Sequence, residues 1–341
     1  MPRQARLDAP GLLQHIMARG IERREIFKDD KDRKSFLDRL ATILEETQTQ
    51  CYAWALIPNH FHLLLRTSLS PLSQVMRRLM TGYAMTFNRR HRRAGHLFQN
   101  RYKSVICEED PYLLELIRYT HLNPLRAGLV KNLKELDKYP WTGHSTILGK
   151  GKNPLMPSYL SNNNRRRAGK SLAEKTVEDV LLLFGDNFSE ARRMYRHFVR
   201  KGVDQGSRAD LQGGGLIRSS GGNKAGLLGR EKEDRELADE RILGSGDFVA
   251  EVLGAANELE ENRIKERIPI DQLADKVTSY FGIKIDDILL KSQRGKICEA
   301  RSVICHMAIN EMKYSGASVG KFLNIRRYSA LRCGERGGGN T

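Results

Sequence analysis

The stretch CYAWALI-PN-HFHLLLR, residues 51–66, decides the fold that we predict, because it joins two apolar runs through a short turn. Residues 51–57 and 60–66 each read as a strand, and Pro58-Asn59 favours a turn between them. Side chains of a strand alternate between its two faces, so His60 and His62 share one face while Phe61 lies on the other. The hairpin therefore carries two imidazoles on one side of a rigid, apolar frame.

The segments around this hairpin predict an α+β fold. In order they are a strand at 12–19, a helix at 29–49, a helix at 71–92, a strand at 101–107 and a helix that begins near Pro111. The helices show apolar residues three and four positions apart, whereas the strands alternate. The resulting order is typical of a ferredoxin-like or RRM-like fold, an antiparallel sheet with helices on one face.

A chain of 341 residues is too long for one ordinary domain. We expect the α+β domain over 1–145, a helical extension with a Gly/Ser/Arg-rich linker over 146–230, and an all-α domain over 231–335. Within the extension, residues 176–201 read as a helical pair. The last part shows short helices joined by tight turns, which is typical of a helix-turn-helix module.

The composition favours a nucleic-acid partner. Lys and Arg number 58 against 41 Asp and Glu, which gives a formal charge of +17, and the pI is about 9.8. A ribosome-associated protein or a merely basic enzyme are the alternatives. Five cysteines without a CxxC pair indicate reduced thiols in a cytoplasmic protein. We expect neither a signal peptide nor a membrane span.

Two residues of the third helix supply groups that a phosphodiester-cleaving site needs. Tyr119 and Asn123 are four apart, so on a helix they share a face, although Pro124 predicts that the helix ends at Asn123. A tyrosine oxygen can attack a DNA phosphodiester in line and leave a covalent phosphotyrosine. A divalent ion held by His60, His62 and the Asn123 amide would polarise that phosphate, and this donor set suits Mg²⁺ or Mn²⁺.

The residues alone leave other interpretations open. An isolated H-x-H is more often a polar pair on a solvated sheet face. Eleven tyrosines are available, and Tyr102, between Arg101 and Lys103, is the rival nucleophile. His121 is interpreted as structural, and His15 as a packed or hydrogen-bonded neighbour of the histidine pair.

Four motifs in order closely resemble the HUH single-tyrosine transposases of insertion sequences, and most of all their REP-associated tyrosine branch. They are MARG at 17–20, NHFHLL at 59–64, GHLFQNRYKS at 95–104 and RYTHLNPLRAGLV at 118–130. The resemblance covers about residues 1–145. It implies that His60 and His62 hold the metal, that Tyr119 is the nucleophile and that Asn123 completes the metal site.

The resemblance also implies a substrate and a reaction. The family cleaves and rejoins single-stranded DNA, often beside a hairpin, without an external energy source. A non-catalytic, domesticated DNA-binding regulator is the second hypothesis, and a rolling-circle initiator or relaxase is the third. A monomer and a homodimer both remain open.

Basic residues extend the predicted DNA contacts. Near the active site they are Arg89, Arg90, Arg92, Arg93, Arg101 and Lys103. Residues 268–325 resemble the C-terminal DNA-binding domain of the replication initiator DnaA, but the following NIRRYSAL lacks its base-reading signature. There we expect Arg326 and Arg327 to bind duplex or hairpin DNA generically.

Overall fold

The computed structural model describes Leu7 and residues 10–68, 70–157, 170–206, 208, 211, 239–265, 268–290, 295–312 and 314–337, with 259–265 and 335–337 as backbone only. The chain divides into two compact units, Met1–Ala256 and Asn257–Thr341. Most of the predicted linker, including its glycine runs, lies outside the described residues. Within the described part, no helix has the length and apolar character needed to cross a membrane.

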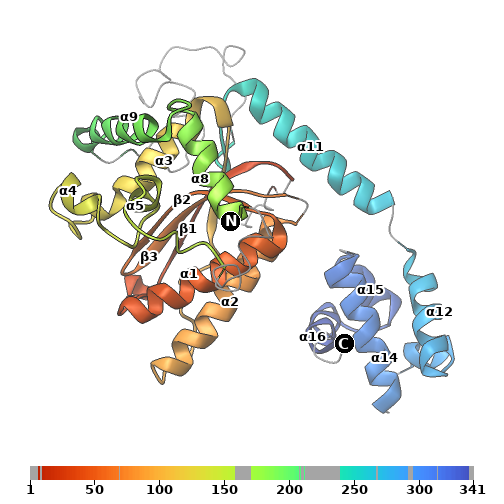
Figure 1. Ribbon diagram of the computed structural model, residues 1–341. Coiled ribbons are helices and arrows are strands. Elements are labelled where there is room, and N and C mark those ends of the chain that lie inside the picture. The colour runs from red at the N-terminus through yellow and green to blue at the C-terminus, as the bar shows by residue number, and fades with distance from the viewer. Residues whose placement is uncertain are drawn as a thin grey trace, which may run out of the picture. The chain divides into compact units, whose positions relative to one another are not determined.

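A five-stranded sheet forms the centre of the first unit (Figure 1). Its strands are β1 (Leu13–Arg19), β2 (Gln50–Ile57), β3 (His60–Arg66), β4 (Lys103–Cys107) and β5 (Ile242–Leu243). They lie in the order β2-β3-β1-β4-β5; the first four are antiparallel, and β5 pairs parallel with β4. The order of β1 to β4 is that of a ferredoxin-like fold, so the predicted α+β class is confirmed.

Helices cover both faces of this sheet. Helices α1 (Asp30–Thr47) and α2 (Leu72–Arg90) lie side by side and bury Phe61 and its neighbours. Helix α3 (Glu109–Arg126) packs on the opposite face, against Leu64. The expectation of helices on one face therefore holds only for α1 and α2. Because Leu63, Leu64 and Leu65 are consecutive, β3 is apolar on both faces, and each face must be buried by a helix or a loop.

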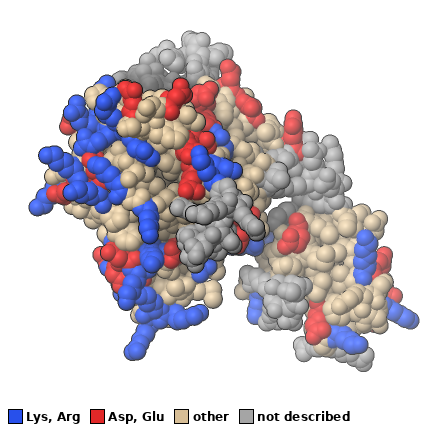
Figure 2. All heavy atoms as spheres, viewed as in Figure 1, with Lys and Arg blue, Asp and Glu red and all other residues tan. Residues whose placement is uncertain are grey.

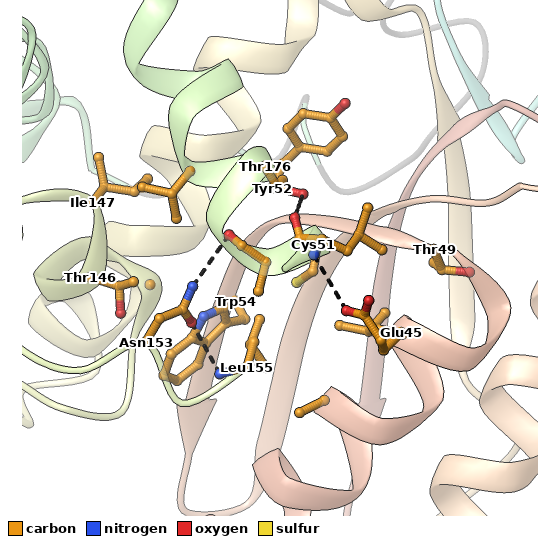
Figure 3. Close-up of a pocket in the computed structure, with 16 residues that line it drawn as sticks. Glu45, Thr49, Cys51, Tyr52, Trp54, Thr146, Ile147, Asn153, Leu155 and Thr176 are labelled. Carbon is orange, nitrogen blue, oxygen red and sulfur yellow. Dashed lines mark hydrogen bonds between the residues drawn. The ribbon is translucent and has the colours of Figure 1, made fainter. Parts of the chain in front are cut away.

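The extension belongs to the same unit. Its described helices are α8 (Leu172–Leu182) and α9 (Phe188–Arg200). The short helix α4 (Leu133–Leu136) precedes it, and α5 (Gly143–Ile147) crosses the predicted boundary at residue 145. A capping box between Ser171 and Glu174 starts α8, which contacts β2. Figure 3 shows the junction, where Asn153 bonds to the Ala173 carbonyl and Leu172 to the Glu45 carboxylate. The cavity left there is about 20 Å³, which has room for one water molecule and not for a substrate.

The second unit is helical and has its own core. Helix α11 (Gly246–Lys265) begins in the first unit; the helices α12 (Ile270–Phe281), α13 (Ile285–Leu289), α14 (Gly295–His306), α15 (Gly316–Phe322) and α16 (Arg327–Gly337) follow. Leu273, Ile304 and Val319 are among the residues that these helices bury together. Pro269 is the N-cap residue of α12.

Candidate active site

The histidine pair lies on the sheet face that α3 covers. In the antiparallel register Met17 faces His62 and Arg19 faces His60. The two imidazole centroids are 5.1 Å apart. His62 is only 3% exposed, whereas His60 is partly buried. The hairpin therefore presents both rings on one sheet face, where β3 begins.

Burial keeps both imidazoles neutral. Burial, together with a smaller contribution from the nearby Arg19 cation, lowers the pKa of His60 to about 4. It also holds the pKa of His62 well below its ordinary value, with smaller contributions from His15 and His60. Only an unprotonated imidazole can bind a metal ion, so the pair is ready to do so at neutral pH. The Nδ1 of His60 lies 2.7 Å from Asn59 Oδ1, which makes Nδ1 the donor and leaves Nε2 for a ligand.

Helix α3 places Tyr119 against the rings of His62 and His15. The phenol ring stands edge-on to His62, with centroids 6.0 Å apart, and edge-on to His15 at 5.8 Å. The Arg126 guanidinium lies over the same phenol ring, 5.2 Å from its centroid. Tyr119 is only 4% exposed. The rival Tyr102 belongs to the apolar cluster on the opposite face, with α1 and α2.

Asn123 follows Tyr119 by one turn, and α3 continues past it. The helix runs through Pro124 to Arg126, so the predicted end at Asn123 is wrong. Pro124 has no N–H to donate to the Thr120 carbonyl. The Asn123 side chain supplies that donor instead, with Nδ2 3.3 Å from Thr120 O. Its amide oxygen is then the atom left to bind a metal.

The donor set fits a divalent ion by its chemistry. Among the described residues, no group of three or more His, Cys, Asp or Glu is arranged to hold a metal. The predicted set uses two imidazoles from that class and one amide from outside it. Both imidazoles are neutral and both have Nδ1 engaged, by Asn59 and by His15 respectively. That is how proteins prepare histidines that bind a metal through Nε2.

One comparison with known proteins covers the segment that contains this site. Residues 9–123 match the family model described as "Transposase IS200 like". This segment is therefore similar to the IS200-like transposases. It makes up about a third of the chain and contains His60, His62, Tyr119 and Asn123.

A solved structure described as "Structure of the REP associates tyrosine transposase bound to a REP hairpin" is similar to part of this chain. The identity is 14% and the TM-score 0.37, over 46% of this chain and 90% of that one. The curated proteins gave no match.

Basic residues of the matched segment differ in what they contact. Arg90 donates to Asp29 and pairs with Asp32, so its charge is already balanced within the fold. Arg92 and Arg93, by contrast, line a cavity of about 490 Å³ with the apolar Phe87 and Leu97, beside the cations Arg24 and Lys28. Arg89 and Arg101 are exposed.

Lys103 lies in the same cross-strand row as His62, because Met17 pairs with both. In the second unit, Arg326 and Arg327 are exposed where α16 begins. Figure 2 shows Lys and Arg side chains gathered over α9 as well, where Arg193 and Arg200 are exposed. The sequence-based set had not included this α9 surface.

Sequence reasoning missed two further residues of the site, Arg19 and Arg126. Arg19 lies beside His60 across the β1–β3 ladder, and Arg126 contacts Tyr119 from within α3. Each lies within one of the four motifs that resemble the transposases, which was the available signal. Only the strand register and the helix beyond Pro124 bring them to the site.

Proposed function

We propose that the transposase domain cleaves and rejoins single-stranded DNA through a covalent bond to Tyr119. The observation that carries this proposal is the position of the Tyr119 ring, 6.0 Å from the ring of His62 and on the same sheet face as His60. A nucleophile and two neutral imidazoles so close together suit phosphoryl transfer better than simple DNA binding.

The proposed step exchanges one phosphodiester for another. The Tyr119 oxygen forms a bond to phosphorus while the bond to the leaving 3′ oxygen breaks, and the phenol proton passes through solvent to that oxygen. The products are a 5′-phosphotyrosine and a free 3′-hydroxyl. A 3′-hydroxyl then attacks the phosphotyrosine in the reverse sense, which restores the phenol and rejoins the strand. No nucleotide triphosphate is consumed, because the bond energy stays in the phosphotyrosine.

His60, His62 and the Asn123 amide would hold the Mg²⁺ or Mn²⁺ ion. Such an ion, when bound, neutralises charge that develops on the scissile phosphate. Arg126 adds a cation of the chain's own beside the attacking group, and Arg19 adds one beside His60. Both would attract the phosphate and favour the transition state electrostatically.

For DNA binding we propose two surfaces. Arg92, Arg93 and their cavity, with exposed Arg89 and Arg101, would contact the backbone of the strand, and Lys103 would do so next to the histidines. Arg326 and Arg327 would contact duplex or hairpin DNA from the second unit. Arg90 would stabilise the fold and would not contact DNA, because it already forms ion pairs with Asp29 and Asp32.

A covalent adduct tests the enzymatic proposal. The full chain is incubated with Mn²⁺ and labelled single strands that carry a hairpin, and denaturing gels reveal any protein-linked label. We expect an adduct from the parent and from Tyr112→Phe, a matched control on the same helix, and none from Tyr119→Phe or with EDTA. Hairpin binding without any adduct would favour the non-catalytic regulator, and an undiminished adduct from Tyr119→Phe would refute the assignment of the nucleophile.

A further inference from the structure

His15 is a third buried imidazole in this site. It lies on β1 and is 3% exposed. The ladder pairs it with Leu64, two residues along from His62, so the side chains of His15 and His62 are diagonal neighbours on one face. Their rings stack with centroids 5.3 Å apart and planes 15° apart. The Nε2 atom of His15 is 3.1 Å from Nδ1 of His62, which is a hydrogen bond.

A hydrogen bond between two neutral imidazoles has one donor, and a second contact indicates which ring it is. His15 also forms a hydrogen bond with the backbone of Leu211, and this bond raises the pKa of the His15 imidazole. A bond that raises the pKa is one in which the ring N–H donates, so the acceptor is the Leu211 carbonyl oxygen. A neutral imidazole has only one N–H. If His15 gives it to Leu211, its Nε2 must accept, and the proton in the His15–His62 contact belongs to Nδ1 of His62.

We propose that His15 is a positioning residue that fixes the tautomer of His62. The relay runs from Nδ1 of His62 to His15 and from His15 to the Leu211 carbonyl, and it leaves the lone pair of His62 on Nε2. The proposal rests on the proposed function in one respect, that His62 is a metal ligand. Without the relay, His62 is free to turn or to place its proton on the nitrogen that the metal needs.

The relay makes the extension part of the active site. Leu211 lies far beyond residue 123, where the match to the transposase family ends, yet it is buried in the cluster that holds Tyr119. The short 3-10 turn Val203–Gln205 approaches the same helix, since Gln205 accepts a hydrogen bond from Arg118 of α3. A segment that we had predicted to be a loosely packed linker therefore supplies the carbonyl that orders the histidines.

Simple packing is the competing explanation, and it makes a different prediction. If His15 only fills space, His15→Phe keeps the stack and should behave like the parent. If His15 accepts the His62 proton, phenylalanine fails and His15→Gln, whose amide oxygen can accept, restores part of the effect. Circular dichroism shows that each variant is folded before it is compared.

The deciding measurement is the tautomer of His62 in the metal-free full chain, read from long-range ¹H–¹⁵N spectra of protein labelled in histidine. His62→Gln identifies the signal. We expect the proton on Nδ1 in the parent, and a shift toward the Nε2–H form in His15→Phe. A parent signal with the proton on Nε2, or an Nδ1–H form that His15→Phe leaves unchanged, would overturn the proposal.

Binding of Mn²⁺ without DNA, measured by titration calorimetry, separates this proposal from the proposed function. We expect His15→Phe to weaken Mn²⁺ binding by about 10-fold or more, as loss of a residue that orients a ligand typically does, and His15→Gln to recover part of it. A parent that shows the expected tautomer but binds no Mn²⁺ would support the relay while refuting metal dependence. Parent and His15→Phe with equal Mn²⁺ affinity would refute the role of His15 in metal binding.

Discussion

Acid should destabilise the metal-free first unit, and His15 should account for a defined share of the loss. Burial lowers the pKa of this imidazole from 6.5 in the unfolded chain to about 4 in the folded protein. Between those values the unfolded chain binds a proton that the folded protein excludes. The contribution of neutral His15 is therefore complete above pH 6.5 and is lost as the pH falls toward 4.

The size of the effect follows from the two pKa values. One pH unit within that window is worth 1.36 kcal/mol, so His15 alone should lower the free energy of unfolding by about 2 kcal/mol between pH 7 and pH 5. Most carboxylates stay ionised in both states above pH 5, which isolates the histidines. His62 and the other buried imidazoles add to the loss in the parent, and the difference between parent and His15→Phe isolates His15.

Urea unfolding, followed by tryptophan fluorescence, measures this change in the stability of the first unit. Both tryptophans of the chain, Trp54 and Trp141, lie within Met1–Ala256. We expect the midpoint to fall less between pH 7 and pH 5 in His15→Phe than in the parent. His197→Gln, at an exposed position of α9, should retain the parent's dependence. Equal pH dependence in parent and His15→Phe would refute the reasoning.

Three further substitutions test the fold around the site. Asp137→Asn should destabilise the first unit by about 3 kcal/mol in urea unfolding, because the buried Asp137 carboxylate accepts from His144 at 3.0 Å and from two cations. Gly20→Ala should cost about 2 kcal/mol in the same assay, since a Cβ there would lie 2.1 Å from the Arg24 carbonyl oxygen. Arg90→Gln should lower the melting temperature while leaving hairpin affinity in a filter-binding assay nearly unchanged; a large loss of affinity would contradict its structural role.

The central fold was predictable because its signals are local. The alternation in residues 51–66 and the helical spacing around it are properties of short segments, and they fix β1 to β4 and their helices. Strand β5 was not predicted, since Ile242–Leu243 is only two residues long and pairs with a strand more than a hundred positions away. The helix on the second face was not predicted: the consecutive leucines of β3 make both faces apolar, but the expected fold had helices on one face only.

The candidate site divides in the same way. The H-x-H pair and the spacing of Tyr119 and Asn123 are visible in the sequence, whereas the approach of His15 and Arg19 depends on strand register. The rule for the residue before proline failed at Asn123, where α3 continues through Pro124 and the Asn123 side chain donates to the Thr120 carbonyl that Pro124 leaves without a backbone donor.

The arginine run 89–93 shows a related limit. Its members look alike in the sequence, and only the position of Asp29 and Asp32 on α1 and its N-cap distinguishes Arg90 from the others. The sequence shows that the segment is basic. Contacts with residues far away in the chain determine which of its cations can still pair with a ligand.

The loss of stability that the three buried histidines cause at low pH favours catalysis over passive DNA binding. Neutral imidazoles at His15, His60 and His62 lower stability as soon as the pH falls below their ordinary range, and apolar side chains at the same positions would avoid that loss. A protein that only binds hairpins through surface arginines gains nothing from this arrangement. Residues that lower the stability of a fold are expected at functional sites. These histidines do so at the place where the Tyr119 ring contacts two of them. The burial of these histidines beside Tyr119 therefore supports the metal site that we propose.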